Sequence, residues 1–165
     1  MPSALECSFV HIGGVGPRTE RALWRMGAAS WDEFLAMAPG HPLGPRRTGA
    51  VAAGVMQSQL ALDAGDARYF TDSLGASEAW RVYPDFAGGV CYLDIETTGM
   101  YRGGSDITFV GVYDGSRVEV FIRGRNLDAL PAALERFGLV VTFNGKTFDL
   151  PFLRHEFGPG LLAGL

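Results

Sequence analysis

The second half of the chain alternates short apolar runs with polar turns. The runs predict four strands, at Val90–Ile95, Ile107–Tyr113, Arg117–Ile122 and Leu139–Phe143. Apolar residues at helical spacing predict a helix over Leu127–Phe137, and a second helix is expected within Thr147–Phe157, with Pro151 in its first turn. The order β-β-β-α-β-α requires a mixed sheet with at least one parallel pair of strands.

The first half has a helical pattern instead. A glycine-rich turn leads into a helix that begins at Pro17 and ends near Gly27, and Ser30 with Glu33 forms a capping-box pattern for the next helix. Further along, we expect a linker over His41–Arg47, helices over Ala50–Leu62 and Asp66–Leu74, and a loop at Tyr83–Asp85. The chain therefore divides into a hairpin segment (1–40), a helical linker region (41–88) and an α/β domain (89–165).

Composition narrows the class of protein. With 165 residues, 47% of them hydrophobic, the chain is long enough to bury a core. No apolar run approaches the roughly 20 residues that span a bilayer, so we expect a cytoplasmic protein without membrane contact. Cys7 and Cys91 are too far apart in the chain for a metal-binding pair. The net charge of −4 provides no global attraction for nucleic acid, so only local patches could bind it.

Two acids stand out on the first predicted strand. Asp94 and Glu96 are two residues apart, so they share one face, while Leu93 and Ile95 point to the other. Two neighbouring carboxylates are tolerated when a hard cation such as Mg²⁺ or Mn²⁺ binds them, or when the strand end simply reaches solvent. Asp149 follows the fourth strand and joins the pair if that strand lies beside the first; taken alone, it is also typical of a helix N-terminus.

These segments resemble a known family. Leu93-Asp94-Ile95-Glu96-Thr97-Thr98-Gly99 is similar to the first motif of the DEDD-type 3′–5′ exonucleases of the ribonuclease H-like superfamily, and residues 144–149 are similar to the second. The sequences of both motifs, with Asp106-Ile107-Thr108 between them, most resemble those of the YprB-type exonucleases.

The resemblance implies a fold, a reaction and a set of residues. The fold is a ribonuclease H-like mixed sheet with flanking helices, and the reaction is hydrolysis of DNA or RNA with two Mg²⁺ or Mn²⁺ ions. Asp94, Glu96 and Asp149 would be the metal ligands and catalytic residues. Contacts to the substrate would come from Thr97, Thr98, Asn144 and Lys146, although ordinary strand-end and turn chemistry accounts for these four equally well.

One feature departs from the family pattern. The family has a fourth acid on a later helix, and the sequence stops at Leu165, soon after the second motif. His155 and Glu156 do not match that third motif and are expected at the surface. We therefore expect a sheet that is incomplete at its C-terminal side, and an activity that is impaired in a fragment or truncated product.

The turn at residues 12–19 resembles the helix-hairpin-helix element of DNA-binding proteins. Glycines let backbone N–H groups approach a phosphate, and the helix N-terminus adds partial positive charge. The nucleic-acid contacts would be Gly14, Gly16, Arg18, Thr19 and Arg21, with Glu20 offsetting one arginine. A helix-packing element without a ligand explains the same turn equally well.

Three functions remain open at this stage. The leading one is a metal-dependent exonuclease; the second is a non-catalytic nucleic-acid-binding module that uses the glycine turn. The third is a Mg²⁺-dependent phosphoester hydrolase for small phosphates, although the chain lacks the Asp-x-Asp pair used in one common route. The sequence leaves the oligomeric state open.

Overall fold

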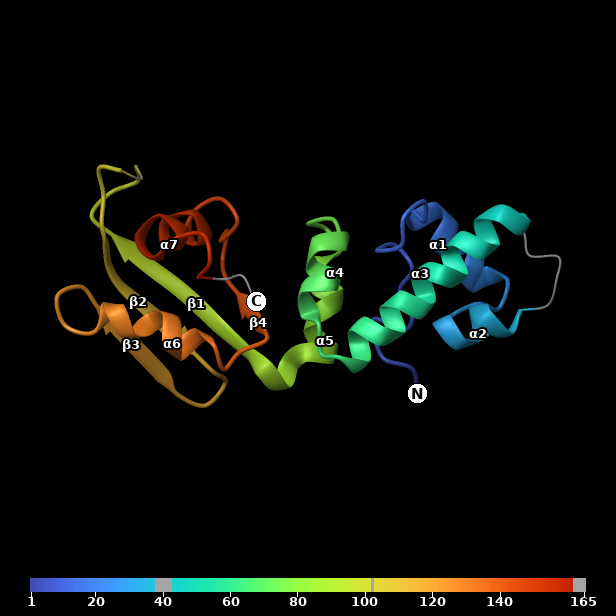
Figure 1. The fold of residues 1–165 in the computed structure, drawn as a ribbon, viewed down its shortest axis with the longest axis horizontal. Helices are drawn as coiled ribbons and strands as arrows, with labels where there is room; N and C mark the ends of the chain where they lie inside the picture. The colour runs from blue at the N-terminus through green and yellow to red at the C-terminus, as the bar shows by residue number, and fades with distance from the viewer. Residues whose placement is uncertain (38–42, 102, 162–165) are drawn as a thin grey trace. The chain divides into compact units, whose positions relative to one another are not determined.

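The computed structural model describes residues 1–37, 43–101 and 103–161. It divides into two compact units, Met1–Phe86 and Ala87–Leu165 (Figure 1). Among the described residues, no helix combines the length and the apolar character that crossing a bilayer requires.

The first unit is helical. Its elements are α1 (Pro17–Arg25), α2 (Trp31–Ala36), α3 (Pro45–Asp63), α4 (Ala67–Ser73), the 3₁₀ turn η1 (Ala79–Val82) and α5 (Tyr83–Phe86). The expected caps are confirmed. Pro17 begins α1, and Gly27 follows the helix with a φ of 92°. At the start of α2, the side chain of Ser30 accepts a hydrogen bond from the backbone N–H of Glu33, and the side chain of Glu33 accepts one from the backbone N–H of Ser30.

Two expectations for this unit are wrong. Tyr83–Asp85 is not a loop, because α5 covers it; Pro84 lies in the first turn, where a missing N–H costs nothing. The linker expected over His41–Arg47 is helical from Pro45 onward, because Gly44 adopts a φ of 74° and sets the chain up for a proline-led start. Residues 41 and 42 of the expected linker lie outside the described residues.

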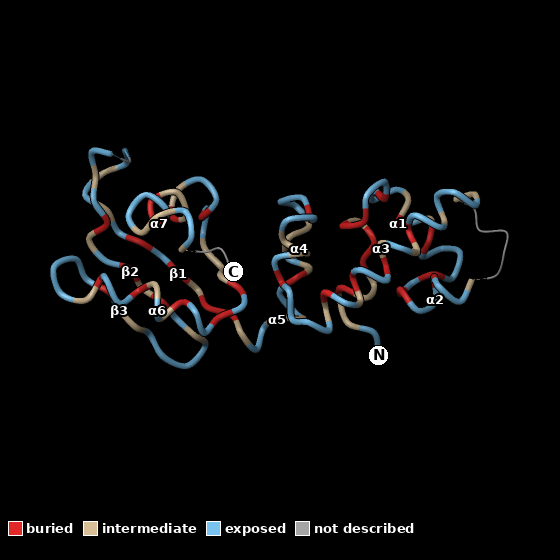
Figure 2. The backbone as a smooth tube through the Cα atoms, viewed as in Figure 1, coloured by how far each residue is buried: buried red, intermediate tan, exposed pale blue. Residues whose placement is uncertain are grey.

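The core of the first unit is aromatic. Phe9, Trp31 and Phe70 are fully buried, and the rings of Trp31 and Phe70 stack with centroids 6.3 Å apart. Figure 2 shows the buried positions of α1, α2 and α3 as red bands along each helix. Burying three large rings gives this small unit several kcal/mol of apolar stabilisation, on the order of 2 kcal/mol each.

The second unit is built on a four-stranded sheet in the order β3-β2-β1-β4. After the short turn η2 (Ala87–Gly89), its elements are β1 (Val90–Thr97), β2 (Ile107–Tyr113), β3 (Val118–Ile122), the 3₁₀ turn η3 (Leu127–Ala129), α6 (Leu130–Leu134), β4 (Leu139–Val141) and α7 (Asp149–Phe157). The pairs β1–β2 and β2–β3 are antiparallel and β1–β4 is parallel. The mixed α/β fold with its parallel pair is confirmed.

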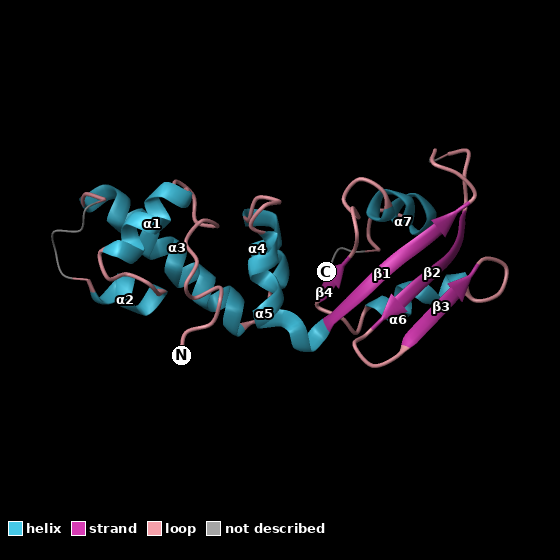
Figure 3. Cartoon of the chain, turned by 180° about the vertical axis from the view of Figure 1, so that it is seen from behind, coloured by secondary structure: helices cyan, strands magenta, loops and turns pink. Residues whose placement is uncertain are grey.

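Both helices of this unit pack on the same core. Leu93, Ile95 and Val110 point into it from the strands, where Leu134 of α6 and Leu153 of α7 meet them. Figure 3 shows the sheet with the two helices behind it. The alternate side chains of β1, β2 and β3 therefore face away from this core, and Asp94 and Glu96 are among them.

Candidate active site

The paired acids stand on the outer face of β1. Asp94 and Glu96 are exposed, whereas Leu93 and Ile95 between them are 3% and 5% exposed. In the register with β2, Asp94 lies opposite Gly111 and Glu96 opposite Phe109. The expected alternation is confirmed: β1 sends its apolar side chains into the core and both carboxylates outward.

The parallel pairing of β4 with β1 brings the second acidic segment alongside the first. Val90, Cys91 and Tyr92 pair with Leu139, Val140 and Val141, so the chain leaves β4 beside the middle of β1. A turn then leads to Asp149, the first residue of α7. The backbone N–H groups of Asp149 itself and of Ile95 in β1 act on its carboxylate as hydrogen-bond donors.

Asp149 is the buried member of the acid set. It is 2% exposed, and burial raises the pKa of its carboxyl. The charge of Asp94 raises this pKa further, while the two backbone hydrogen bonds lower it. A carboxyl that is desolvated beside another acid gains most from a cation, because the cation favours the ionised form of both.

The geometry fits a metal centre only in part. Asp94 and Asp149 are close enough for their charges to interact, and carboxylate oxygens suit Mg²⁺ or Mn²⁺. Within residues 1–37, 43–101 and 103–161, however, no three His, Cys, Asp or Glu side chains form a group that could hold a metal ion. Glu96 is therefore not gathered with the two aspartates in this structure.

Most of the residues expected to touch substrate have local hydrogen-bond partners. The hydroxyl of Thr97 donates to the carbonyl of Gly99 (2.7 Å), and that of Thr98 accepts from the N–H of Asp106 (2.9 Å). The side-chain oxygen of Asn144 accepts from the hydroxyl of Thr147 (2.7 Å). These three hydrogen bonds are those of an ordinary strand end or turn, which is the alternative explanation that the sequence allowed for these residues.

Lys146 differs from those three. Its side chain is exposed, and it forms no salt bridge with any described residue. It lies in the turn between β4 and α7, three residues before Asp149. It is the cation best placed in this turn to meet a phosphate.

Two exposed aromatic residues of this unit were not identified from the sequence. Phe109, opposite Glu96, is 39% exposed, and Phe143, directly before Asn144, is 92% exposed. Alternation along Ile107–Tyr113 contains the signal for Phe109, but only the register with β1 shows that it faces an acid. Phe143 was assigned to the end of a strand, and β4 ends at Val141.

The glycine turn of the first unit presents a basic helix start. Gly14 has a φ of 82°, Gly16 caps α1, and Arg18 and Arg21 are exposed, with Thr19 half-buried. Arg47 at the start of α3 donates to the carbonyl of Gly14 (3.1 Å) and so adds a third arginine beside the turn.

Glu20 does not offset these arginines as expected. It is 1% exposed and points into the first unit, where it accepts from the N–H of Phe9 (2.7 Å) and pairs with Arg81 (3.0 Å). Its charge is therefore balanced inside the unit by Arg81. Arg18 and Arg21 are exposed and form no salt bridge with any described residue.

Comparison with known proteins gives one match. Residues 91–162 match the family model described as the RNase H superfamily, which spans the sheet and both helices of the second unit. No curated protein and no solved structure matches the chain. The match supports assignment of the second unit to the ribonuclease H-like superfamily and leaves the first unit outside the matched range.

Proposed function

We propose that the second unit hydrolyses nucleic-acid phosphodiesters in the manner of a metal-dependent 3′–5′ exonuclease. The premise is the match of residues 91–162 to the ribonuclease H superfamily. The observation that carries the proposal is the position of Asp149. It lies buried at the start of α7, bonded to the backbone of β1 and within electrostatic reach of Asp94. The motif wording makes a YprB-type enzyme the specific form of the proposal.

Each residue has a separate task in this proposal. Asp94 and Asp149 would hold a divalent cation, and Glu96, on the same strand face, would complete the ligand set and orient the attacking water. A bound cation supplies Lewis-acid activation of the phosphate and of water. Lys146 would contact a phosphate, and the exposed ring of Phe143 would stack on the terminal base.

The test combines metal binding with nuclease assays on the whole chain. Titration calorimetry with Mn²⁺ should show binding that Asp94→Asn and Asp149→Asn each weaken by about tenfold or more. Degradation of oligonucleotides labelled at the 3′ or the 5′ end should begin at the 3′ end and fall by at least about a hundredfold in both variants.

Asp128→Asn is the matched control, because Asp128 is an exposed acid of the same unit on η3. It should bind Mn²⁺ and degrade substrate like the unmodified chain. Wild-type protein that binds no Mn²⁺, or binding that none of these changes affects, would overturn the proposal. Turnover of a nucleotide monoester without any of a polynucleotide would favour the small-phosphate hydrolase instead.

We also propose a second function, in which the first unit binds nucleic acid through its glycine turn. The observation that favours it is the inward ion pair of Glu20 with Arg81, which leaves Arg18 and Arg21, at the start of α1, without a salt bridge to any described residue. Backbone N–H groups and arginines bind phosphates without reading sequence, so binding should weaken steeply as salt rises.

Fluorescence anisotropy with labelled duplex and single-stranded DNA tests this function. Arg18→Glu with Arg21→Glu should weaken binding by about tenfold or more at low salt. Arg125→Glu changes the charge of the chain in the same direction from an exposed loop of the other unit and should have a much smaller effect. A loss of binding free energy in Arg125→Glu half as large as that in the double variant, in proportion to the charge change, would show that net charge alone drives the binding.

A further inference from the structure

The long helix α3 carries apolar residues on two faces. Val51 and Val55 lie on the buried face, at 3% and 0% exposure. On the other face, Met56 is 58% exposed and Leu60 is 70% exposed. A helix that is polar on its outer side needs no partner there, whereas an apolar outer side is typical of a helix that packs against something further.

The exposed residues form a regular seam along the helix. They recur at alternating intervals of three and four, and we call this set the α3 seam: Arg46, Gly49, Ala53, Met56, Leu60 and Asp63. Intervals of three and four are the heptad spacing by which two helices pack side by side in a coiled coil. The seam therefore has the spacing of a helix–helix interface.

The α3 seam is complementary to its own reversed copy. If two α3 helices run antiparallel about a two-fold axis near residues 54 and 55, Ala53 of each lies opposite Met56 of the other. In the same arrangement Gly49 lies opposite Leu60. Each large side chain then meets a small one, which lets the helices approach closely and fill the space between them.

The charges at the ends of the seam are also complementary. Arg46 is the second residue of α3 and Asp63 is its last, and in the antiparallel pair Arg46 of each helix lies opposite Asp63 of the other. Within one chain both are badly placed, because a cation at a helix N-terminus and an anion at its C-terminus oppose the helix dipole. Neither forms a salt bridge with any described residue.

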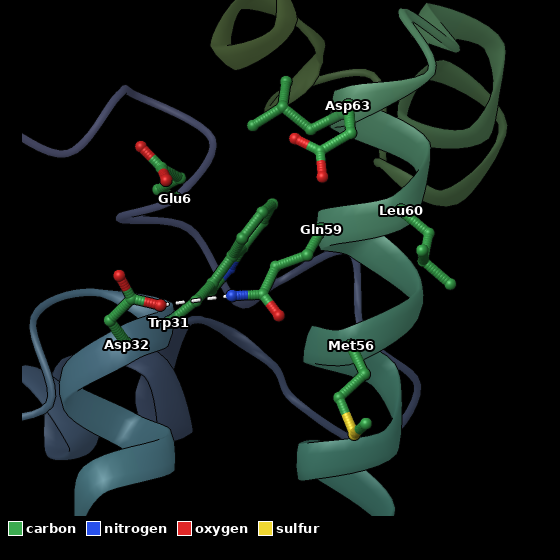
Figure 4. A pocket seen from close by; sticks show the side chains of 8 residues that line it. Glu6, Trp31, Asp32, Met56, Gln59, Leu60 and Asp63 are labelled. Atoms are coloured by element: carbon green, nitrogen blue, oxygen red, sulfur yellow. Dashed lines mark hydrogen bonds between the residues drawn. The ribbon is translucent and has the colours of Figure 1, made fainter.

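The neighbouring face of α3 is already in use. Gln59 donates to the carboxylate of Asp32 in α2 (3.1 Å), across a hollow of about 390 Å³ whose lining includes Met56, Leu60 and Asp63 (Figure 4). This contact ties α3 to α2 on one side. Met56, Leu60 and Asp63 of the seam line this hollow on its α3 side, and Met56 and Leu60 remain exposed there.

We propose that the α3 seam binds the same seam of a second copy of this chain, as an antiparallel two-fold pair of helices. Met56 and Leu60 provide the apolar contact, and Arg46 pairs with Asp63 of the second copy at each end. We assign the partner as a second copy because, in the antiparallel pair, each large side chain of the seam lies opposite a small one and each charge lies opposite its counter-charge. The proposal is independent of whether the second unit is a nuclease.

Sedimentation of the full chain over a dilution series tests the pairing. The unmodified chain should sediment as a dimer that dissociates on dilution. Leu60→Glu should raise the dissociation constant by about a hundredfold, since it places a charge in the apolar contact. Arg46→Asp alone and Asp63→Arg alone should each raise it roughly tenfold, because each creates two like-charge contacts.

The decisive variant combines the two charge changes. Arg46→Asp with Asp63→Arg restores opposite charges across the antiparallel pair and should recover most of the lost affinity. Leu35→Glu, at a 41% exposed leucine of α2, is the matched control and should leave the dimer intact. A monomer at every concentration would overturn the proposal, and so would a dimer that Leu60→Glu does not weaken or that the double variant does not restore.

Discussion

Asp94 and Asp149 are two aspartates in different surroundings. Asp94 is exposed on the outer face of β1, while Asp149 is buried and held by the N–H of Ile95. Burial and, to a smaller degree, the charge of Asp94 destabilise the anionic form of Asp149 and raise its pKa. Such a pair accepts a cation more readily than two exposed acids do.

Asp94→Asn should therefore lower the pKa of Asp149. The substitution removes the charge that raises this pKa and leaves burial and the backbone hydrogen bonds in place. Carboxyl carbon chemical shifts followed through an acid titration measure it directly. Asp128→Asn should leave the pKa of Asp149 where it was. An unchanged value in Asp94→Asn would mean that the two acids do not sense each other.

His11 gives the first unit a dependence on pH. It is buried, its Nε2 lies 2.8 Å from the hydroxyl of Ser58, and burial lowers the pKa of its ring to about 4, with a smaller contribution from Arg81. The unfolded chain takes up this proton near pH 6.5, while the folded unit does not until about pH 4. The unit should thus be fully stable above pH 6.5 and lose stability as the pH falls toward 4.

The expected loss is about 3 kcal/mol across that window. Urea unfolding at a series of pH values measures it, and His11→Gln is the comparison, since glutamine can still bond to Ser58 but takes up no proton. The difference between the two proteins isolates His11 from the carboxyls that titrate in the same range. Parallel curves for both would contradict the assignment.

At the scale of elements, much of the second unit follows from local pattern. The strands β1, β2 and β3 begin and end within two residues of the predicted limits, because alternation and the Asp114-Gly115 turn are local signals. The approach of Asp149 to Asp94 was conditional on which strands are neighbours, and no local signal decides that. The register of β4 against β1 settles it.

The first unit shows what local patterns miss. Glu20 was expected to offset one of the two arginines at the start of α1, and it is buried instead. Its partner Arg81 is 61 residues away in the chain. A buried ion pair depends on two distant residues meeting in the core, and neither residue signals the other in the sequence.

The turn from β4 to α7 is the element that positions Asp149. A Cβ added at Gly145 would lie 1.8 Å from the hydroxyl of Thr142, and the N–H of Leu150 bonds to the carbonyl of Gly145 (2.9 Å). Gly145→Ala must therefore displace the turn, at a cost of about 2 kcal/mol. Mn²⁺ affinity should fall with it, since Asp149 follows four residues later.

Gly138→Ala is the control for that change, because a Cβ there meets nothing within 4 Å. Thermal unfolding and Mn²⁺ titration of both variants test the prediction. Gly145→Ala should be impaired in both measurements and Gly138→Ala in neither. Normal metal binding by Gly145→Ala would show that Asp149 does not depend on this turn.

At the scale of the molecule, the tryptophans and the proposed metal ligands lie in different units. All three tryptophans, Trp24, Trp31 and Trp80, lie in the first unit. The proposed metal ligands Asp94 and Asp149 lie in the second. Tryptophan fluorescence therefore reports unfolding of the first unit alone, while circular dichroism reports both.

Mn²⁺ should raise the unfolding temperature of the second unit and leave that of the first unchanged. Stabilisation by a ligand is confined to the unit that binds it, and amounts to about 2.7 kcal/mol at a hundred times the dissociation constant. The dichroism transition should then move upward while the fluorescence transition stays in place. Asp149→Asn should reduce the shift by about half or more at the same Mn²⁺ concentration. If the tryptophan transition moves with the dichroism, either the first unit binds the metal or the two units unfold as one.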